Sequence, residues 1–397
     1  MVEKVPTRYE CHFNPKYRHL IGKNMHTNEY YCQFKNIHMV PKKNDPLEYH
    51  ERYQAEEEEF KRLGLNSKMV YTNKVIAGRE IPQGGISADD ESLDISQDSN
   101  ELFTTVQEIE ELNDEFPSFV HGSAYRPRTT LSHGQMKLFL TVFQFLLYYS
   151  EPDEEVHIVY PGSAPGSTLP LIFELFPMTY WYLYDPSSFD PKLKNHPNII
   201  VQENEFFTIH TCRKLKRKLH DKKILFISDI RTLDPSEEDI EEDMQRQRLW
   251  VEELKPVYSQ LKFKLPYDYK EPVFKYFNGP AYIQAFAKTY SKELRLVVDG
   301  TKEFEYTKWN IGDYDTAMYL FNVYFRTSTY KTRVKNKYVG DCHDCVMFIK
   351  LMQDYKLYGH VSSFKNLSVT KMIDHVTSHV PGFRTAYMKN SSAVEIR

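Results

Sequence analysis

The stretch Val156-His-Ile-Val-Tyr-Pro-Gly-Ser-Ala-Pro-Gly166 decides the fold, because an apolar strand runs directly into a glycine-rich turn. Glycine lets the backbone turn tightly and approach a ligand without a Cβ in the way. The glycine spacing differs from the GxGxxG of dinucleotide folds and from the GxxxxGK(S/T) of phosphate-binding loops, which disfavours a nicotinamide-dependent dehydrogenase. A tight turn that binds no ligand remains the alternative for this stretch taken alone.

Strands and helices alternate on both sides of this stretch, which predicts a mostly parallel α/β sheet covered on both faces. In such sheets ligands bind beyond the carboxyl ends of the strands. We expect strands at 156–160, 180–184, 198–201, 223–228, 260–265 and 294–298, and helices at 134–149, 169–176, 208–220 and 235–258.

The length of 397 residues allows two or three domains. We predict an N-terminal extension at 1–77, an acidic linker at 78–117, the domain that carries the sheet at 118–340, and a C-terminal extension at 341–397. The formal net charge of -4 hides a basic region beyond residue 330, so a nucleic-acid partner is not excluded.

Cellular location follows from cysteine usage and apolar runs. Five cysteines form no dense framework, and the N-terminus lacks the apolar region of a signal peptide. The longest apolar run, at 138–149, is well short of the roughly 20 residues that span a bilayer. We therefore expect an intracellular protein without a membrane span.

Asp185 makes the predicted ligand of the glycine turn more specific. It ends the strand that follows the turn, where a carboxylate can accept hydrogen bonds from the two hydroxyls of an adenosine ribose. Turn and acid together predict a nucleoside cofactor. The alternative is an aspartate that only initiates a turn before Pro186.

Further charged residues fall near the same crevice. Asp229 ends the fourth strand, and Arg231 can pair with it or reach a cofactor carboxylate. Lys137 lies on the helix before the first strand, Lys262 lies in a strand, and Glu293 precedes the last strand. Any one of these charges alone is typical of a solvated surface.

Five ordered blocks carry a resemblance to a known family. They are Gln135-Met-Lys137, Val159 to Gly166, Ile227-Ser-Asp-Ile-Arg231, Leu261-Lys262 with Pro266, and Tyr290-Ser-Lys-Glu293-Leu-Arg295. Together they resemble the poxvirus cap-specific mRNA 2′-O-methyltransferases, which are also small, regulatory subunits of the viral poly(A) polymerase. The resemblance covers about 134–324. It implies a Rossmann-like S-adenosylmethionine-dependent methyltransferase sheet with helices on both faces, an N-terminal extension, and a large nucleocytoplasmic DNA virus as the source.

The resemblance implies a catalytic tetrad of Lys137, Asp229, Lys262 and Glu293, as in the wider group of ribose methyltransferases. A ribose hydroxyl is a poor nucleophile, so methyl transfer needs in-line approach and removal of the hydroxyl proton. A second cation and desolvation lower the pKa of a lysine. We therefore expect Lys262 to be the general base, with Lys137 lowering its pKa. Lys264 remains the competing base, because side chains two positions apart in a strand share a face.

The implied cofactor is S-adenosylmethionine. Two positions depart from the family, because Thr168 stands where the family has His and Ser187 where it has Arg, so contacts on that side must differ. The residues implied to bind the cofactor are Tyr160, Gly162, Ser163, Ala164, Pro165, Gly166, Asp185, Asp229 and Arg231.

A methylated guanine cap carries a positive charge and calls for aromatic faces together with carboxylates. The resemblance implies an aromatic clamp of Tyr267 and Tyr290, with Asp315 at the edge of the base. Asp268 lies one position earlier than the family's second acid, which leaves that assignment open. Ordinary packing is the alternative for both tyrosines.

Capped mRNA is the expected partner, and the resemblance adds a poly(A) polymerase catalytic subunit. The alternative function is therefore a noncatalytic RNA-binding processivity subunit, a role that can coexist with catalysis. Basic segments at 213–218 and 331–337 are candidates for phosphate contacts, although a solvated helix face explains the first equally well. Cys342 and Cys345 have CxxC spacing without a second pair, so we predict no metal. The resemblance implies a location in the host cytoplasm or the virion.

Overall fold

A computed structural model describes residues 102–111, 131–194, 196–232, 235–266, 272–323, 325–328 and 330–388. It also describes three short strands, β1 (Val75–Ile76), β2 (Arg79–Glu80) and β3 (Gly85–Ile86). The predicted N-terminal extension and acidic linker therefore lie largely outside the described residues.

Seven strands form the central sheet in the order β10-β11-β8-β7-β4-β5-β6. The order runs outward in both directions from β4, as in Rossmann-like methyltransferase folds, which confirms the predicted fold class. The five parallel strands are β4 (Val156–Pro161), β5 (Thr179–Asp185), β6 (Ile199–Glu203), β7 (Ile224–Ser228) and β8 (Tyr258–Phe263). At one edge, β11 (Leu294–Asp299) pairs antiparallel with β8, and β10 (Ala281–Tyr282) pairs antiparallel with β11.

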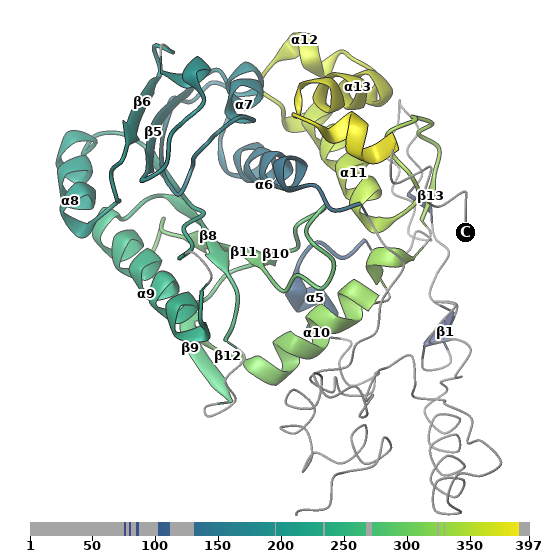
Figure 1. Ribbon diagram of the computed structural model, residues 1–397, viewed down its shortest axis with the longest axis horizontal. Coiled ribbons are helices and arrows are strands. Elements are labelled where there is room, and N and C mark those ends of the chain that lie inside the picture. Colours follow the sequence, from purple (N-terminus) through teal and green to yellow (C-terminus); the bar gives the residue numbers. More distant parts are fainter. Residues whose placement is uncertain are drawn as a thin grey trace, which may run out of the picture.

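Helices cover both faces of the sheet, as the alternation predicts (Figure 1). Successive residues of β4 enter different cores, Ile158 and Tyr160 on one face and Val159 on the other. The core with Ile158 also takes in α6 (Gly134–Tyr149), α7 (Leu169–Leu175), α11 (His343–Tyr358), α12 (Ser362–Lys365) and α13 (Val369–His379). The core with Val159 takes in α5 (Val106–Glu110), α8 (Ile209–Lys218), α9 (Glu237–Leu254) and α10 (Ile311–Val323).

The predicted helix at 235–258 is too long at its C-terminal end. Ser236 caps α9 in a capping box with Asp239, and the helix ends at Leu254. Lys255 then adopts a left-handed conformation with φ 53°, and Pro256 cannot continue a helix. Strand β8 therefore begins at Tyr258, two residues before the predicted start.

Several elements have no counterpart in the sequence prediction. Strands β9 (Val273–Phe277) and β12 (Tyr306–Asn310) pair antiparallel as a separate ribbon. Two 3-10 turns, η4 (Pro191–Leu193) and η5 (Phe325–Thr327), and β13 (Lys331–Thr332), which pairs with β3, complete the described elements.

Segments predicted to lie outside the sheet domain share its cores. Phe103, Val106 and Ile109 belong to the same buried cluster as α10, although they fall in the predicted linker. Helix α11, in the predicted C-terminal extension, packs against α6. In the part of the chain that the structure describes, no helix is long and apolar enough to cross a membrane.

Candidate active site

The glycine-rich turn after β4 lies against the ends of both neighbouring strands. The Gly162 amide donates to the Tyr184 carbonyl at 2.9 Å, and the Asp229 amide donates to the Pro161 carbonyl at 3.1 Å. Gly162 has φ +79°, and a Cβ built there would lie 2.6 Å from the backbone carbon of Asp229. Only glycine fits this position without moving backbone.

Asp185 holds the turn and also initiates one of its own. Its Oδ2 accepts from the amide of Ala164 at 3.1 Å, and its Oδ1 accepts from the amide of Ser187 at 2.8 Å. The carboxylate therefore lies beside the glycine turn, as expected of a ribose-binding acid, while making the turn contact that the alternative predicts.

The other predicted cofactor residues surround the same turn. The Ser163 hydroxyl donates to the Tyr160 carbonyl at 2.8 Å, and both residues are buried. Gly166 has φ +67°, and the Pro165 carbonyl accepts from the amide of Asp190 at 2.9 Å.

Arg231 does not pair with Asp229, so that suggested partnership is wrong. Its Nη1 lies 4.0 Å from Oδ2 of Asp243, at the edge of an ion-pair contact. Both Nη atoms are buried and have no hydrogen-bond partner among the described residues. These two atoms could still donate hydrogen bonds to a ligand, which keeps the predicted cofactor contact of Arg231 open.

The side chains of the four predicted catalytic residues form one cluster, although they are far apart in the sequence. They are Lys137, Asp229, Lys262 and Glu293. Lys262 Nζ lies 3.0 Å from Oδ1 of Asp229 and 3.4 Å from Oε2 of Glu293. Lys137 Nζ lies 3.0 Å from Oε1 of Glu293. The two lysines are thus joined through the two oxygens of one carboxylate.

Arg295 is a fifth charged member that the sequence analysis quoted without a role. Its Nη2 lies 2.7 Å from Oδ1 of Asp229 and 3.5 Å from Oε1 of Glu293, and its side chain is 2% exposed. The signal was a charged residue at the second position of an apolar strand, opposite Lys262 in the neighbouring strand.

The charges of this cluster hold its acids ionised. Burial favours the neutral carboxyl of Asp229, but the three neighbouring cations outweigh burial and lower the pKa of Asp229. The same opposition, with Lys262 as the strongest cation, holds the pKa of Glu293 well below its usual range. Both acids therefore carry a negative charge at neutral pH.

Two glutamines fix the strands that carry the cluster. Gln247, on α9, donates to the Lys262 carbonyl and accepts from its amide, each at 3.0 Å. Gln284 accepts from Nε of Arg295 at 3.0 Å and donates to the Glu293 carbonyl at 2.9 Å. These contacts limit the movement of the charged side chains.

The structure distinguishes Lys262 from Lys264, the alternative candidate for the general base. Strand β8 ends at Phe263, so Lys264 no longer follows the strand alternation. Its Nζ lies 3.1 Å from Oε1 of Glu237 at the start of α9. Lys262, and not Lys264, lies in the cluster.

The predicted cap residues are only partly described. Tyr267 and Asp268 lie outside the described residues. Tyr290 is 43% exposed and has φ 65°, a conformation that is strained for a tyrosine and is common at functional sites. Asp315 is 2% exposed, and its Oδ1 lies 2.6 Å from Nζ of Lys292, the neighbour of Glu293 in the chain.

The two predicted basic segments differ in the partners of their positive charges. On α8, Arg213 and Lys216 pair with Glu253 at 3.2 and 3.7 Å. In the second segment, Lys337 Nζ lies 5.0 Å from the centre of the Tyr338 ring. No group of three or more potential metal ligands occurs within the described residues.

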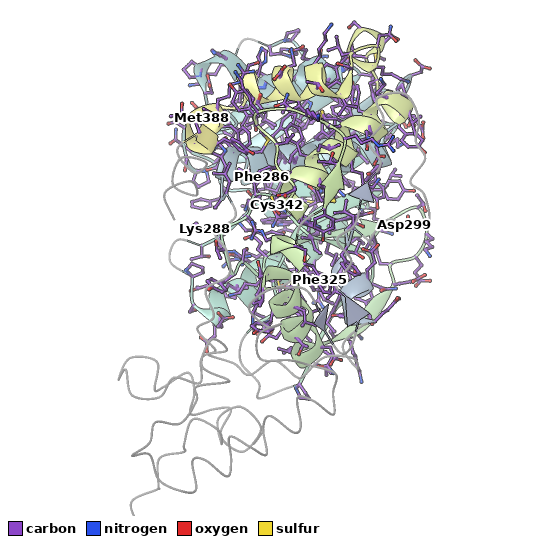
Figure 2. The ribbon with its side chains drawn as sticks, turned by 90° about the vertical axis from the view of Figure 1, so that its right-hand side faces the viewer. Phe286, Lys288, Asp299, Phe325, Cys342 and Met388 are labelled. Atoms are coloured by element: carbon purple, nitrogen blue, oxygen red, sulfur yellow. The ribbon has the colours of Figure 1, made fainter. Side chains whose placement is uncertain are left out.

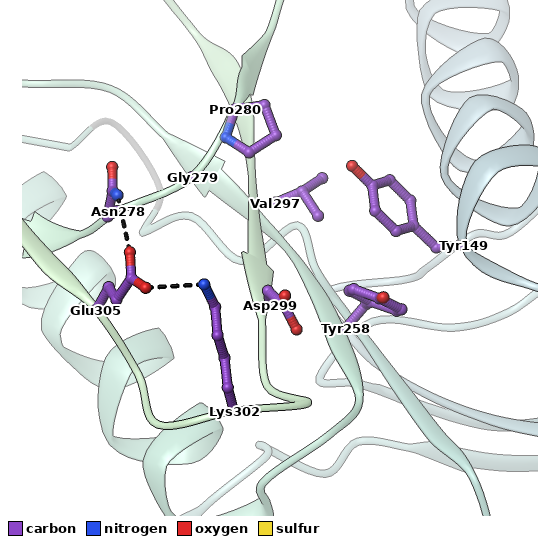
Figure 3. Close-up of a pocket in the computed structure, with 9 residues that line it drawn as sticks. All are labelled: Tyr149, Tyr258, Asn278, Gly279, Pro280, Val297, Asp299, Lys302 and Glu305. Carbon is purple, nitrogen blue, oxygen red and sulfur yellow. Dashed lines mark hydrogen bonds and ion pairs between the residues drawn. The ribbon is translucent and has the colours of Figure 1, made fainter.

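A separate cavity of about 380 Å³ lies away from this cluster. Its lining includes Tyr258 and Asp299 (Figure 3). Tyr258 begins β8 and Asp299 ends β11, whereas Lys262 and Glu293 lie at the opposite ends of these strands. The cavity contains none of the predicted site residues.

Comparisons with known proteins identify a family and relatives of this chain. A sequence model described as "Poly A polymerase regulatory subunit" matches residues 103–375. The cap-specific mRNA (nucleoside-2′-O-)-methyltransferase of Myxoma virus (strain Lausanne) is 28% identical over 238 residues, 55% of this chain and 69% of the relative. The protein of the same name from Fowlpox virus (strain NVSL) is 34% identical over 185 residues, 41% of this chain and 57% of the relative.

Among solved structures, bluetongue virus VP4, described as a multifunctional RNA-capping production-line, aligns over 75% of this chain and 49% of its own. The TM-score is 0.39 and the sequence identity 14%. The family match, by contrast, spans well over half of the chain. The chain belongs to the poly(A) polymerase regulatory subunit family.

Proposed function

We propose that this chain is a cap-specific mRNA 2′-O-methyltransferase that acts on the ribose of the first transcribed nucleotide. One observation carries the proposal: Lys262 Nζ lies within 3.4 Å of both Asp229 and Glu293, beside the glycine turn. The names of the poxvirus relatives support the same activity.

The residues around the turn fit S-adenosylmethionine. Asp185 lies against the turn, with a carboxylate that can accept from ribose hydroxyls. Arg231 offers buried Nη atoms without acceptors among the described residues, which suits the carboxylate of an amino acid. When bound, S-adenosylmethionine supplies a methyl group on a positively charged sulfur.

The chain's own residues supply the proton chemistry. Lys262 is the proposed general base that removes the proton of the ribose hydroxyl. Lys137, Lys262 and Arg295 each contact the carboxylate of Asp229, of Glu293 or of both, so three cations and two acids meet where the hydroxyl would be held. Asp229 and Glu293 orient the amine of Lys262.

Cap recognition is proposed for Tyr267, Asp268, Tyr290 and Asp315. Tyr290 is 43% exposed, and an aromatic ring attracts a positively charged base. It lies three residues before Glu293, so a base on this ring would be held near the cluster. Asp315 would act from within its ion pair with Lys292.

The proposal is tested by incubating the protein with labelled S-adenosylmethionine and three RNAs that differ only at the 5′ end. One ends in an N7-methylguanosine cap, one in an unmethylated cap and one in a triphosphate. After digestion, we expect label on the 2′-O-methylated first nucleoside of the capped RNA. Label at N7 of guanine, on a base or nowhere would overturn the proposal.

A second role, as a processivity subunit of a poly(A) polymerase, is favoured by membership of the regulatory subunit family. It is tested by adding the protein to a purified poxvirus poly(A) polymerase catalytic subunit and measuring tail lengths. We expect longer tails, also with Lys262→Ala, because the role needs RNA contact without methyl transfer. Unchanged tail lengths would contradict this role and leave the methyltransferase proposal standing.

A further inference from the structure

The segment 286–292 lies between β10 and β11 and carries Tyr290, which is proposed to contact the cap. Glu293 of the charged cluster follows it directly. Phe286 and Tyr290 have φ values of 59° and 65°, a left-handed conformation that residues other than glycine rarely adopt. Such residues keep this conformation only where surrounding contacts hold the chain. The segment therefore depends on anchors outside itself.

Arg326 binds the first half of this segment through two backbone carbonyls. Its Nη2 donates to the Ala287 carbonyl at 2.5 Å, and its Nη1 donates to the Lys288 carbonyl at 3.2 Å. Nε and Nη2 also donate to Oδ2 of Asp344 at 3.0 and 2.8 Å, and Nη1 to Oδ1 of Asn322 at 3.3 Å. A guanidinium has five N–H groups, and these five contacts use all of them.

Helix α10 holds the second half of the segment. Nδ2 of Asn322 donates to the Ser291 carbonyl at 3.0 Å, and the Tyr314 hydroxyl donates to the Lys292 carbonyl. Asn322 is buried at 3% exposure. Because its other side-chain atom accepts from Arg326, Asn322 joins the anchors of the two halves.

The arginine itself is held in place by a buried ion pair. Asp344, at the start of α11, and Arg326 are both almost fully buried. Figure 2 labels Phe286 and Lys288 of the segment in the same part of the molecule as Phe325, which precedes Arg326 in the chain. The ion pair fixes one side of the guanidinium, so its remaining N–H groups meet the segment at a defined place.

We propose that Arg326 and Asn322 are positioning residues for cap recognition, which hold the segment 286–292 in its binding conformation. Through the segment they place Tyr290. The inference rests on the proposed function, because that proposal assigns the cap to Tyr290. Neither anchoring residue acts on the reacting atoms.

Loss of an anchor should weaken cap binding more than the chemical step. A segment that leaves its binding conformation part of the time lowers the apparent affinity in proportion. Glu293 has further anchors, since Gln284 donates to its carbonyl at 2.9 Å and Lys137 pairs with its carboxylate at 3.0 Å. We therefore expect a higher KM for capped RNA, with kcat nearly unchanged.

Two variants of the full chain test the inference. Arg326→Lys keeps a positive charge beside Asp344 but offers three N–H groups from a single nitrogen, so it cannot make all five contacts. Asn322→Ala removes the bond to the Ser291 carbonyl. In a fluorescence titration we expect each variant to bind a cap analogue at least about fivefold more weakly. Affinity for S-adenosylmethionine should change by less than about twofold, because the five contacts of Arg326 include no residue of the glycine turn.

Hydrogen–deuterium exchange of the peptide that covers 286–292 tests the anchoring without any cap. We expect faster exchange there in both variants. Gln107→Ala is the control, because the Gln107 side chain also bonds backbone, at Gly279 and Ala281, but outside the segment. It should leave both the exchange of 286–292 and cap affinity unchanged.

The two measurements separate this inference from the proposed function. If the parent protein binds no cap analogue, cap recognition by Tyr290 fails and the role in cap recognition fails with it, while exchange still shows whether the segment is anchored. If the parent binds the cap, unchanged exchange in both variants, or faster exchange with parental cap affinity, would overturn the inference alone. Equal losses of cap and S-adenosylmethionine affinity would also overturn it, because they indicate a general loss of structure.

Discussion

Arg295 and Asp229 form a buried ion pair within the tetrad cluster, with 2.7 Å between Nη2 and Oδ1. Their side chains are 2% and 13% exposed. The pair joins β11 to the end of β7 and positions the carboxylate that contacts Lys262. The arginine thus sets the place of a proposed catalytic group without itself being a proposed acid or base.

Arg295→Met should destabilise the protein strongly, because it leaves Asp229 buried beside one cation fewer. Removing one partner of a buried ion pair costs about 3–5 kcal/mol. Urea unfolding measures the loss. Arg213→Met is the control, because the pair of Arg213 with Glu253 is exposed and should contribute less than about 1 kcal/mol. Equal effects of the two substitutions would contradict a structural role for Arg295.

Lys262→Ala should strongly slow methyl transfer and leave cap binding intact. Loss of a general base lowers the rate by about 10²–10⁴-fold. Single-turnover kinetics measures the rate, and fluorescence titration with a cap analogue measures binding. Lys264→Ala is the matched control, because Lys264 contacts Glu237 outside the cluster. Undiminished turnover of the Lys262 variant would assign the base to another group.

Gly162→Ala should weaken S-adenosylmethionine binding, because the new Cβ would lie 2.6 Å from backbone of Asp229 at φ +79°. Strain of about 1–3 kcal/mol corresponds to roughly a 5- to 150-fold loss of affinity. Calorimetric titration measures it. Gly134→Ala, where nothing lies within 4 Å of a new Cβ, should leave the affinity unchanged. Full affinity of the Gly162 variant would argue against this turn as the cofactor site.

The sequence was most informative about polar residues that lie at the carboxyl ends of predicted strands. Asp185 and Asp229 each follow or end a buried strand, and parallel strands bring such residues to one edge of the sheet. The tetrad positions came from the resemblance, and the structure brings all four side chains together. Whether each performs its assigned role stays a prediction.

Other features depend on packing that the sequence pattern does not encode. Lys262 and Lys264 look equivalent until β8 is known to end at Phe263. Arginine is usually a surface residue. The pairing of β11 with β8 is what buries the charge of Arg295 between two acids. The left-handed conformation of Lys255, which ends α9, is likewise not signalled by a glycine or asparagine at that position.

Glu110 should make stability depend on pH near neutrality. Burial and the charge of Asp313 raise its pKa from 4.5 to about 7. The folded state therefore binds the proton more tightly than the unfolded state, so stability falls as pH rises from about 4.5 to about 7 and then levels off. Glu110→Gln removes this penalty and should raise Tm by about 2 °C or more near pH 8, with a smaller gain near pH 5. Thermal unfolding at both pH values measures the difference. Glu111 is exposed, so the control Glu111→Gln should shift Tm equally at both pH values. An equal shift at both pH values in the Glu110 variant would refute a raised pKa for Glu110.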